Sequence, residues 1–281
     1  MFFMLIILVL FNSSHAINIS YSENVNVTSK DFSELWAVVA TFGSPSNDNK
    51  NAEDLINILK NNGWKTNNII YMEGFDVSKD AILNISDNLN ELGVKEDDLI
   101  LFFFSMHGNR IEDVPPYDEP DNMDETIIVY DEETYYTNIL DDELRLMFDE
   151  INCNNMVIIF EACYSGGMID GSSDLKKSGR VIITSAKEDE TSFGRFLFRG
   201  WLFPYFLNIG LKGWADKNRD GHITAEEAFA YADKRTVRRS TIFAIILYIV
   251  HLELIIQHPQ IYDGWPSEGN NKEELKLICK K

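Results

Sequence analysis

Apolar residues in this chain occur in short uninterrupted runs that alternate with segments of mixed polarity. A strand with one wet face alternates apolar and polar positions, whereas a run that is apolar throughout indicates that both faces are covered. The runs that we assign to strands are 35–40, 68–72, 99–106, 126–130, 156–160 and 180–186. Their alternation with helical patterns predicts an α/β fold with a mostly parallel central sheet between helices.

The segments between these runs carry helix signals. Gly63 is placed to end the first helix, and Ser78 to accept a hydrogen bond from the first turn of the second. Asp141 is expected to cap a third helix that runs to Phe148, since acidic residues suit the positive end of a helix. The apolar residues that share a face are Leu55, Ile56 and Leu59 in the first helix, and Ile82, Ile85 and Leu89 in the second.

Residues 241–256 form the longest apolar segment near the C-terminus. The segment is short for a membrane span, and His251 and Glu253 interrupt it. We therefore expect a buried helix there.

Two of the expected strands end on residues with catalytic chemistry. His107 and Gly108 directly follow the strand 99–106, and Cys163 lies on a glycine-rich turn after 156–160. The carboxyl ends of parallel strands meet at one edge of a sheet, where a thiolate nucleophile needs an acid/base partner. The pattern predicts that Cys163 attacks, that His107 protonates the departing amine, and that the N–H groups of Cys163 and Gly108 hold the oxyanion.

Each of these residues also has a plain structural explanation. A cysteine after a strand is most often a small buried hydrophobe, and a histidine beside a glycine is most often a turn residue. The joint occurrence on two suitable strands, with glycine after each residue, favours the catalytic interpretation of His107 and Cys163.

The formal net charge of -20 argues against nucleic acid and anionic membranes as partners. The acidity is concentrated: residues 112–150 hold 15 of the 45 carboxylates and one basic residue, Arg145. Such a segment is either solvated, binds a cation or faces a basic substrate. Its position directly after the His107 strand keeps the substrate-facing interpretation open.

The N-terminus has the features of an export signal. Residues 1–11 are apolar, and small residues follow at Ser14 and Ala16, which predicts a signal peptide at 1–16, followed by a lead segment at 17–33 and one domain at 34–281. The protein is then secreted or extracytoplasmic, and contact with a membrane is expected only if the segment stays uncleaved. With three cysteines, Cys153 and Cys279 could pair and leave Cys163 as a reactive thiol.

The segments around the two candidate catalytic residues resemble a known group of proteins. Residues 161–168, which contain Cys163, resemble the nucleophile segment of the legumain family of cysteine peptidases. Residues 118–127 and 139–144 are more similar to metacaspases. Both groups belong to the caspase–haemoglobinase fold, so the resemblance implies a caspase-like three-layer sandwich over roughly 34–200 and a dyad at His107 and Cys163.

The resemblance also concerns the substrate pocket. It implies that Glu161 lies beside the pocket for the residue preceding the cleaved bond. Legumains complete that pocket for asparagine with an arginine on the loop after the first strand, but the first basic residue there is Lys50. With Glu161, and with Asp189 or Glu190 after the next strand, a basic residue in the pocket is as plausible as asparagine.

A second, independent motif lies at residues 216–227. The twelve positions match an EF-hand calcium loop, with glycine at the sharp turn and a helix expected after the loop, at 225–234. No second loop is present as a partner, and we expect a structural calcium ion. The expected ligands are Asp216, Asn218, Asp220, Glu227 and the backbone carbonyl of His222.

Together these features predict an exported cysteine endopeptidase that acts on peptides or proteins through a thioacyl intermediate and binds calcium. No cofactor is needed for the chemistry itself. Two alternatives stay open: a non-catalytic calcium-binding or adhesion protein on the same scaffold, and a transpeptidase or ligase in which an amine replaces water.

Overall fold

The computed structural model describes residues 32–43, 48–117, 119, 121–171, 175–194, 200–249, 256–266 and 274–279. The expected signal peptide at 1–16 and nearly all of the lead segment at 17–33 lie outside the described residues.

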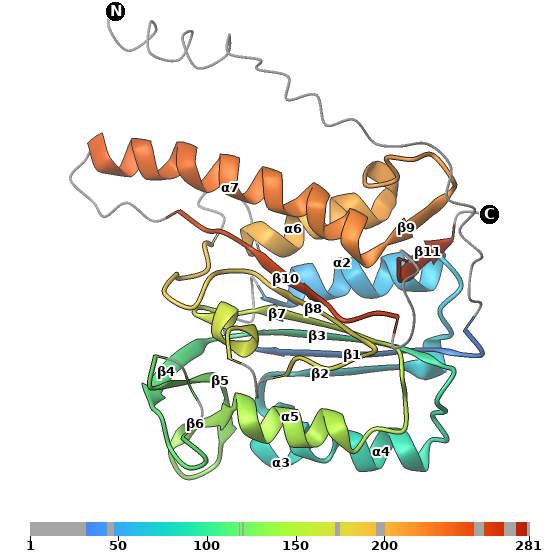
Figure 1. Cartoon of the computed structure of the whole chain (residues 1–281), viewed down its shortest axis with the longest axis horizontal. Coiled ribbons are helices and arrows are strands. Elements are labelled where there is room, and N and C mark those ends of the chain that lie inside the picture. Colours follow the sequence, from blue (N-terminus) through green and yellow to red (C-terminus); the bar gives the residue numbers. More distant parts are fainter. Residues whose placement is uncertain are drawn as a thin grey trace, which may run out of the picture.

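A six-stranded sheet runs through the middle of the protein (Figure 1). Its strand order is β10-β8-β7-β3-β1-β2, and only β10 is antiparallel to its neighbour. The strands are β1 (Leu35–Phe42), β2 (Ile69–Glu73), β3 (Leu99–Met106), β7 (Met156–Glu161), β8 (Arg180–Thr184) and β10 (Gln260–Asp263). The predicted mostly parallel sheet is therefore confirmed.

Helices cover both faces of this sheet, which gives three layers (Figure 1). The upper layer in this view contains α2 (Asp48–Asn61), α6 (Leu202–Ile209), the π-helical turn η4 (Gly210–Trp214) and α7 (Ala225–Ile249). The lower layer contains α3 (Lys79–Leu83), α4 (Ile85–Glu91) and α5 (Asp141–Asp149). Short helical turns are η1 (Thr66–Asn68), η2 (Gly74–Asp76) and η3 (Ser165–Ile169).

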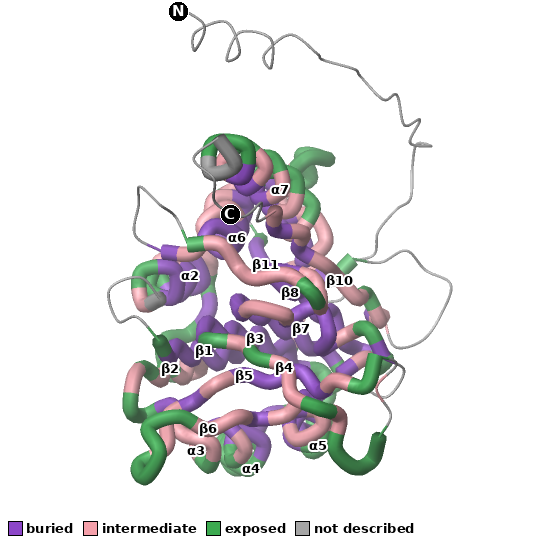
Figure 2. The backbone as a smooth tube through the Cα atoms, turned by 90° about the vertical axis from the view of Figure 1, so that its left-hand side faces the viewer, coloured by how far each residue is buried: buried purple, intermediate pink, exposed green. Residues whose placement is uncertain are grey.

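The apolar runs explain why two helical layers are needed. Successive side chains of a strand point to opposite faces, so an uninterrupted apolar strand has two faces to bury. In β3, Phe102 and Phe104 pack in one buried cluster while Phe103 packs in the other. The four inner strands of the central sheet, β1, β3, β7 and β8, are accordingly buried along most of their length, whereas the edge strands β2 and β10 are partly exposed (Figure 2).

A second, smaller sheet lies at the carboxyl end of the central strands. It is antiparallel and consists of β4 (Gly108–Glu112), β5 (Met123–Asp131) and β6 (Tyr135–Leu140) in that order. The expected single strand at 126–130 is thus the middle of three. A two-stranded sheet pairs β9 (His222–Thr224) with β11 (Lys276–Cys279) at the other end of the molecule (Figure 1).

Two helix predictions need correction. The helix after Ser78 is interrupted at Asn84, although the Ser78 hydroxyl does accept the Ala81 N–H as expected. Asp141 is the first residue of α5 rather than its cap, because the N-cap position is Leu140, whose N–H is accepted by the Glu143 carboxylate.

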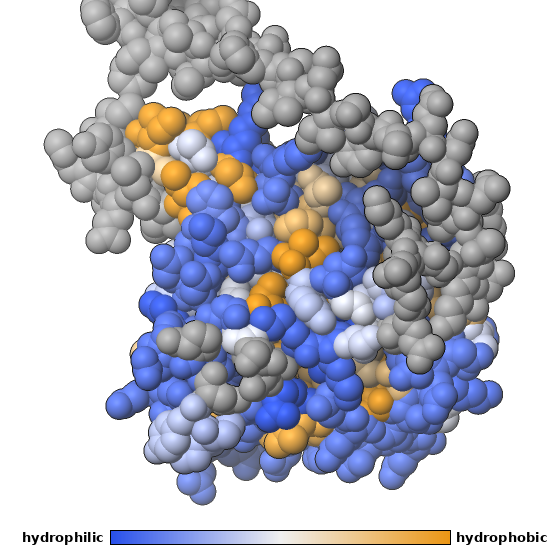
Figure 3. Space-filling model, in the orientation of Figure 1, coloured by the Kyte–Doolittle hydropathy of each residue, from blue (hydrophilic) through white to orange (hydrophobic). Residues whose placement is uncertain are grey.

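The segment at 241–256 is not the separate buried helix that its sequence predicts. It begins inside α7, and residues 250–255 lie outside the described part of the chain. Ile242, Ile245 and Ile246 are 37%, 41% and 53% exposed, and hydrophobic side chains gather over this end of α7 in Figure 3. Within the described residues, no helix combines the length and the apolar character that crossing a membrane requires.

Candidate active site

Residues 107 and 163 lie at the ends of two adjacent parallel strands. β3 and β7 are paired, with Ser105 opposite Glu161. His107 directly follows β3, and Cys163 follows β7 by two residues, so both lie at the carboxyl edge of the sheet. The backbones meet there at Gly108, the residue after His107.

Gly108 lies directly against the backbone of the cysteine turn. A Cβ atom built on Gly108 would be 2.0 Å from the carbonyl oxygen of Cys163 and 3.1 Å from the Cβ of Ala162. No other residue type fits there without moving the turn, because real Cβ atoms do not approach a carbonyl oxygen so closely. The glycine beside the histidine thus has a steric cause, namely the close approach of the two strand ends.

The Cys163 thiol is half-buried. Burial raises its pKa, the backbone N–H of Ser192 opposes this shift by hydrogen bonding, and the nearby charge of Glu161 raises the pKa further. The resting group is consequently a thiol rather than a thiolate at neutral pH. A base must remove its proton before it can attack a carbonyl carbon.

The loop at 187–194 covers the cysteine turn. Its Glu190 carbonyl accepts the N–H of Tyr164 at 2.8 Å, and a Cβ on Gly166 would collide with the backbone of this loop. Buried Gln257 fixes the loop from the other side, because its Nε2 donates to the Ser185 carbonyl at 2.7 Å and its Oε1 accepts the Phe193 N–H at 2.9 Å.

The three acidic residues expected at the substrate pocket have different environments. Glu161 is buried, 1% exposed, and accepts a hydrogen bond from the Ser192 hydroxyl. Glu190 binds His258, whose Nδ1 and backbone N lie 2.5 and 2.7 Å from its carboxylate oxygens. Asp189 is exposed on the same loop. The structure thus places Glu161 next to Cys163 and joins Glu190 to a residue that the sequence did not suggest.

The His107 side chain is exposed and lines a groove of about 310 Å³. The other lining residues come from the small sheet: Asn109, Ile128, Tyr136, Thr137 and Asn138. The backbone is fixed at this point, since the His107 carbonyl accepts the N–H of Ile128 at 2.9 Å. The groove is where a substrate could reach the imidazole.

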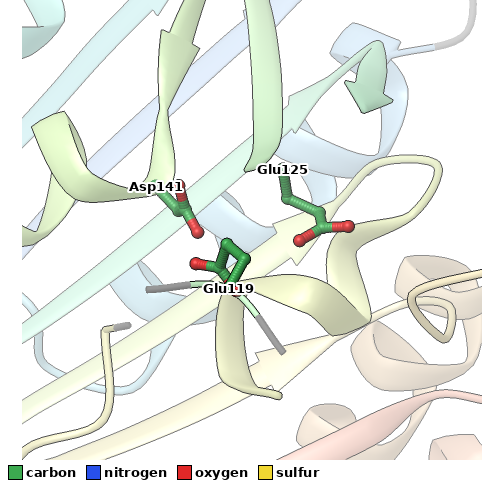
Figure 4. A group of neighbouring side chains, drawn as sticks. All are labelled: Glu119, Glu125 and Asp141. Carbon is green, nitrogen blue, oxygen red and sulfur yellow. The ribbon is translucent and has the colours of Figure 1, made fainter. Parts of the chain in front are cut away.

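Behind the cysteine turn, three carboxylates from the acidic segment converge. Oxygen atoms of Glu119, Glu125 and Asp141 lie within 4.8 Å of one another, which is close enough to share a cation (Figure 4). Glu125 comes from β5 and Asp141 from the start of α5. The sequence indicated an acidic segment that could bind a cation, but not which side chains meet.

Glu125 has the most perturbed environment of this group. It is 1% exposed, and neither of its carboxylate oxygens has a hydrogen-bond partner among the described residues. Burial, together with the charges of Asp170, Asp141 and Asp121, raises its pKa to about 9. It also touches the cysteine turn, because a Cβ on Gly167 would lie 1.9 Å from its Cδ. Without a cation, Glu125 is therefore protonated at neutral pH.

The expected calcium loop at 216–227 lies at the end of the sheet away from the small sheet (Figure 1). Gly221 has a φ of 85°, as the sharp turn of such a loop requires. Asp220 Oδ1 accepts the N–H of His222, and Glu227 Oε2 that of Thr224. The carboxylates of the loop are not among the acidic groups that converge within 4.8 Å in the described part of the chain.

A strand from the C-terminal part of the chain pairs with this loop. The loop strand β9 is antiparallel to β11, so that His222 lies opposite Cys279. The three cysteines are not joined by disulfides, and buried Cys153 has its Sγ 3.2 Å from the Asp98 carbonyl oxygen.

Comparisons with known proteins show the family and the fold. The model of the Peptidase C13 family matches residues 78–243, more than half of the chain. Metacaspase-4 of Arabidopsis thaliana is 32% identical over 108 residues, which are 37% of this chain and 25% of that protein. The chain thus spans about a quarter of the length of the curated relative it matches.

Two solved structures share the fold. Caspase-1 from Spodoptera frugiperda matches with a TM-score of 0.59 at 14% identity and covers 95% of this chain and 99% of its own. Protein GSU0716 from Geobacter sulfurreducens matches with a TM-score of 0.53 at 15% identity, over 86% and 99% of the two chains. The fold is that of the caspase-like cysteine peptidases. The chain belongs to the Peptidase C13 family.

Proposed function

We propose that this protein is a cysteine endopeptidase in which His107 and Cys163 form the catalytic dyad. The observation that carries the proposal is the packing of the two strand ends, where Gly108 lies against the carbonyl of Cys163. Membership of a peptidase family supports the reaction class. The half-buried thiol of Cys163 and the exposed imidazole of His107, which lines a groove, support the assignment of roles.

The reaction begins with the neutral thiol. His107 takes the proton of Cys163 as Sγ attacks the scissile carbonyl carbon, and the N–H groups of Cys163 and Gly108 stabilise the oxyanion. The carbon–nitrogen bond then breaks as His107 gives its proton to the leaving amine. Water, activated by the same imidazole, hydrolyses the thioester, and the proton returns to Sγ.

The substrate residue that precedes the cleaved bond, which belongs to the acyl part of the substrate, is proposed to bind beside Glu161 and the loop at 187–194. The carboxylate of Glu161 lies next to the nucleophile, which favours a basic residue preceding the cleaved bond. Glu190 is held by His258 and is assigned to positioning this loop rather than to direct contact with substrate. A preference for Asn would instead require a donor for the side-chain oxygen of the substrate.

We propose that calcium binds the loop at 216–227 as a structural ion. The left-handed turn at Gly221 and the pairing of β9 with β11 support a preformed loop. The position of the loop, away from His107 in the fold, favours a role in stability rather than in the reaction. The apolar N-terminus supports export of the protein, and a mass spectrum of the secreted protein would locate the cleavage expected after residue 16.

A peptide library tests the proposed activity. The full-length protein, with calcium and with chelator, is incubated with peptides that place Arg, Lys, Asn or Asp before internal bonds, and the products are identified by mass spectrometry. We expect internal cleavage, and its loss in Cys163→Ala and His107→Ala. Absence of cleavage under both conditions would overturn the proposal.

A further inference from the structure

Five aromatic side chains form a shelf beside the His107 groove. They are Phe42 at the end of β1, Phe75 in η2, and Tyr130, Tyr135 and Tyr136 on the hairpin of β5 and β6. Each ring contacts another, with centroid separations from 4.8 Å, as between Tyr135 and Tyr136, to 6.4 Å, as between Phe42 and Tyr130. We call this cluster the aromatic shelf.

The shelf is unusually accessible for a cluster of aromatic rings. Phe75, Tyr135 and Tyr136 are 64%, 50% and 56% exposed. Exposed aromatic side chains that contact one another on an otherwise polar surface commonly mark a binding surface. Tyr136 belongs to the shelf and also lines the groove, so the shelf is continuous with the groove that His107 lines.

The hairpin that carries the shelf is held in a defined shape. Asp131 Oδ1 accepts hydrogen bonds from the N–H groups of Glu133 and Thr134 and from the Thr134 hydroxyl, at 2.7 to 3.0 Å. Thr126 donates to Asn138 across the two strands at 2.9 Å. A surface fixed in this way loses little freedom when a ligand binds.

The order of the strands determines which part of a substrate lies on this side. Glu161 and the loop at 187–194 flank Cys163 on the side of β7 and β8, where the acyl part of the substrate is proposed to bind. His107 lies between β3, which pairs with β1, and β4, the first strand of the small sheet. A general acid must lie within hydrogen-bond reach of the leaving nitrogen. The first residue after the cleaved bond is therefore next to the imidazole and the groove.

From this juxtaposition we infer that the groove between His107, Ile128 and Tyr136 is a subsite for the first residue of the leaving group. It selects an apolar or aromatic side chain, which packs on Ile128 and on the ring of Tyr136. This inference rests on the proposed peptidase function and names a determinant of specificity for it. Replacing Tyr136 by Ala removes the aromatic wall of the subsite and should lower the preference for an apolar over an acidic residue after the cleaved bond about tenfold.

The test compares substrates that differ only on the leaving side. Internally quenched peptides share one cleavable acyl sequence and carry Phe, Leu, Gly or Asp directly after the cleaved bond. A peptide aldehyde of the same acyl sequence reacts with Cys163 but has no leaving group, so its inhibition constant reports the acyl side alone. The variants are Tyr136→Ala, Tyr136→Phe and Trp214→Ala. Trp214 is a control because it is 73% exposed and lies in the opposite helical layer.

We expect the wild-type protein to cleave the Phe and Leu peptides at least about tenfold more efficiently than the Asp peptide. Tyr136→Ala should remove most of this preference, while Tyr136→Phe and Trp214→Ala keep it and the aldehyde binds all four proteins alike. Equal cleavage of all peptides by the wild type would overturn the subsite. An equal loss for every peptide and for the aldehyde in Tyr136→Ala would do the same, because the residue would then act only on the fold. If the wild-type protein neither cleaves a peptide nor binds the aldehyde, the peptidase function itself fails and the subsite with it.

Discussion

The buried carboxyl of Glu125 makes a specific prediction about stability. In the folded protein its pKa is raised to about 9, mainly by burial and then by the neighbouring carboxylates. In the unfolded chain the group has its ordinary pKa of 4.5. The folded state therefore holds a proton that the unfolded state releases between these two values. The contribution of Glu125 to stability is greatest below pH 4.5 and falls as the pH rises towards 9.

The magnitude follows from the linkage relation. One group that is protonated only in the folded state changes the free energy of unfolding by about 1.4 kcal/mol per pH unit. Between pH 6 and pH 8 this amounts to roughly 2.7 kcal/mol as an upper value. Relaxation and entry of water reduce such shifts, so we expect about 1–3 kcal/mol. Glu125→Gln keeps the shape and removes the ionisation, and should remove this slope.

The free energy of unfolding of the Cys163→Ala protein, with and without Glu125→Gln, is measured in urea at pH 6 and at pH 8. Chelator is present throughout. Glu112→Gln is the matched control, because this carboxylate is exposed on the neighbouring strand β4. The gap in stability between the background and Glu125→Gln should change between the two pH values, while the gap for Glu112→Gln stays constant. If both gaps are independent of pH, burial does not hold a proton on Glu125.

Three further perturbations test other parts of the structure. Gly108→Ala places a methyl group 2.0 Å from the Cys163 carbonyl oxygen. We expect the free energy of unfolding in urea to fall by about 1–3 kcal/mol and peptide cleavage to fall more than about tenfold. Normal cleavage would show that the strand ends are not in close contact. Glu190→Gln removes the carboxylate that binds His258. It should lower kcat/KM and speed the alkylation of Cys163 by iodoacetamide. If kcat/KM and the alkylation rate are both unchanged, Glu190 has no role in positioning the loop. Calcium at 100 times its Kd should raise the Tm by about 5–10 °C, and Glu227→Gln should abolish most of this rise; the same rise in that variant would exclude the loop as the binding site.

The inner strands of the central sheet were predictable because they are buried on both faces. The run at 99–106 is apolar except for Ser105 and the run at 156–160 is apolar throughout, and the structure buries every residue of β3 and β7. The position of His107 and Cys163 at one edge of the sheet was predictable for the same reason, since parallel strands bring their carboxyl ends to one edge. The half-exposed edge strand β10 was not predicted.

The small sheet was only partly predictable. β4 reads Gly-Asn-Arg-Ile-Glu, and its residues are all exposed or half-exposed, so no regular alternation indicates a strand. Its pairing with β5 depends on contacts between the acidic segment and the end of β3. Tyr135 and Tyr136 look like ordinary strand formers in the sequence, and only the fold places Tyr136 in the groove that His107 lines.

Contacts between side chains from distant segments could not be predicted from the sequence. Glu190 and His258 are 68 residues apart, and nothing in either segment indicates their contact. Ser192 and Gln257 likewise stabilise the loop over Cys163 through bonds between distant segments. Glu161, by contrast, was assigned to the site in advance, because the resemblance of residues 161–168 to the legumain nucleophile segment implies it.

The most direct test of the catalytic dyad is the value of kcat/KM for one cleaved peptide in wild type, Cys163→Ala and Cys279→Ala. Cys279 is the matched control because it is an exposed cysteine at the other end of the molecule. The account predicts that Cys163→Ala loses activity by about 10³-fold or more, while Cys279→Ala retains that of the wild type. Undiminished cleavage by Cys163→Ala would contradict it.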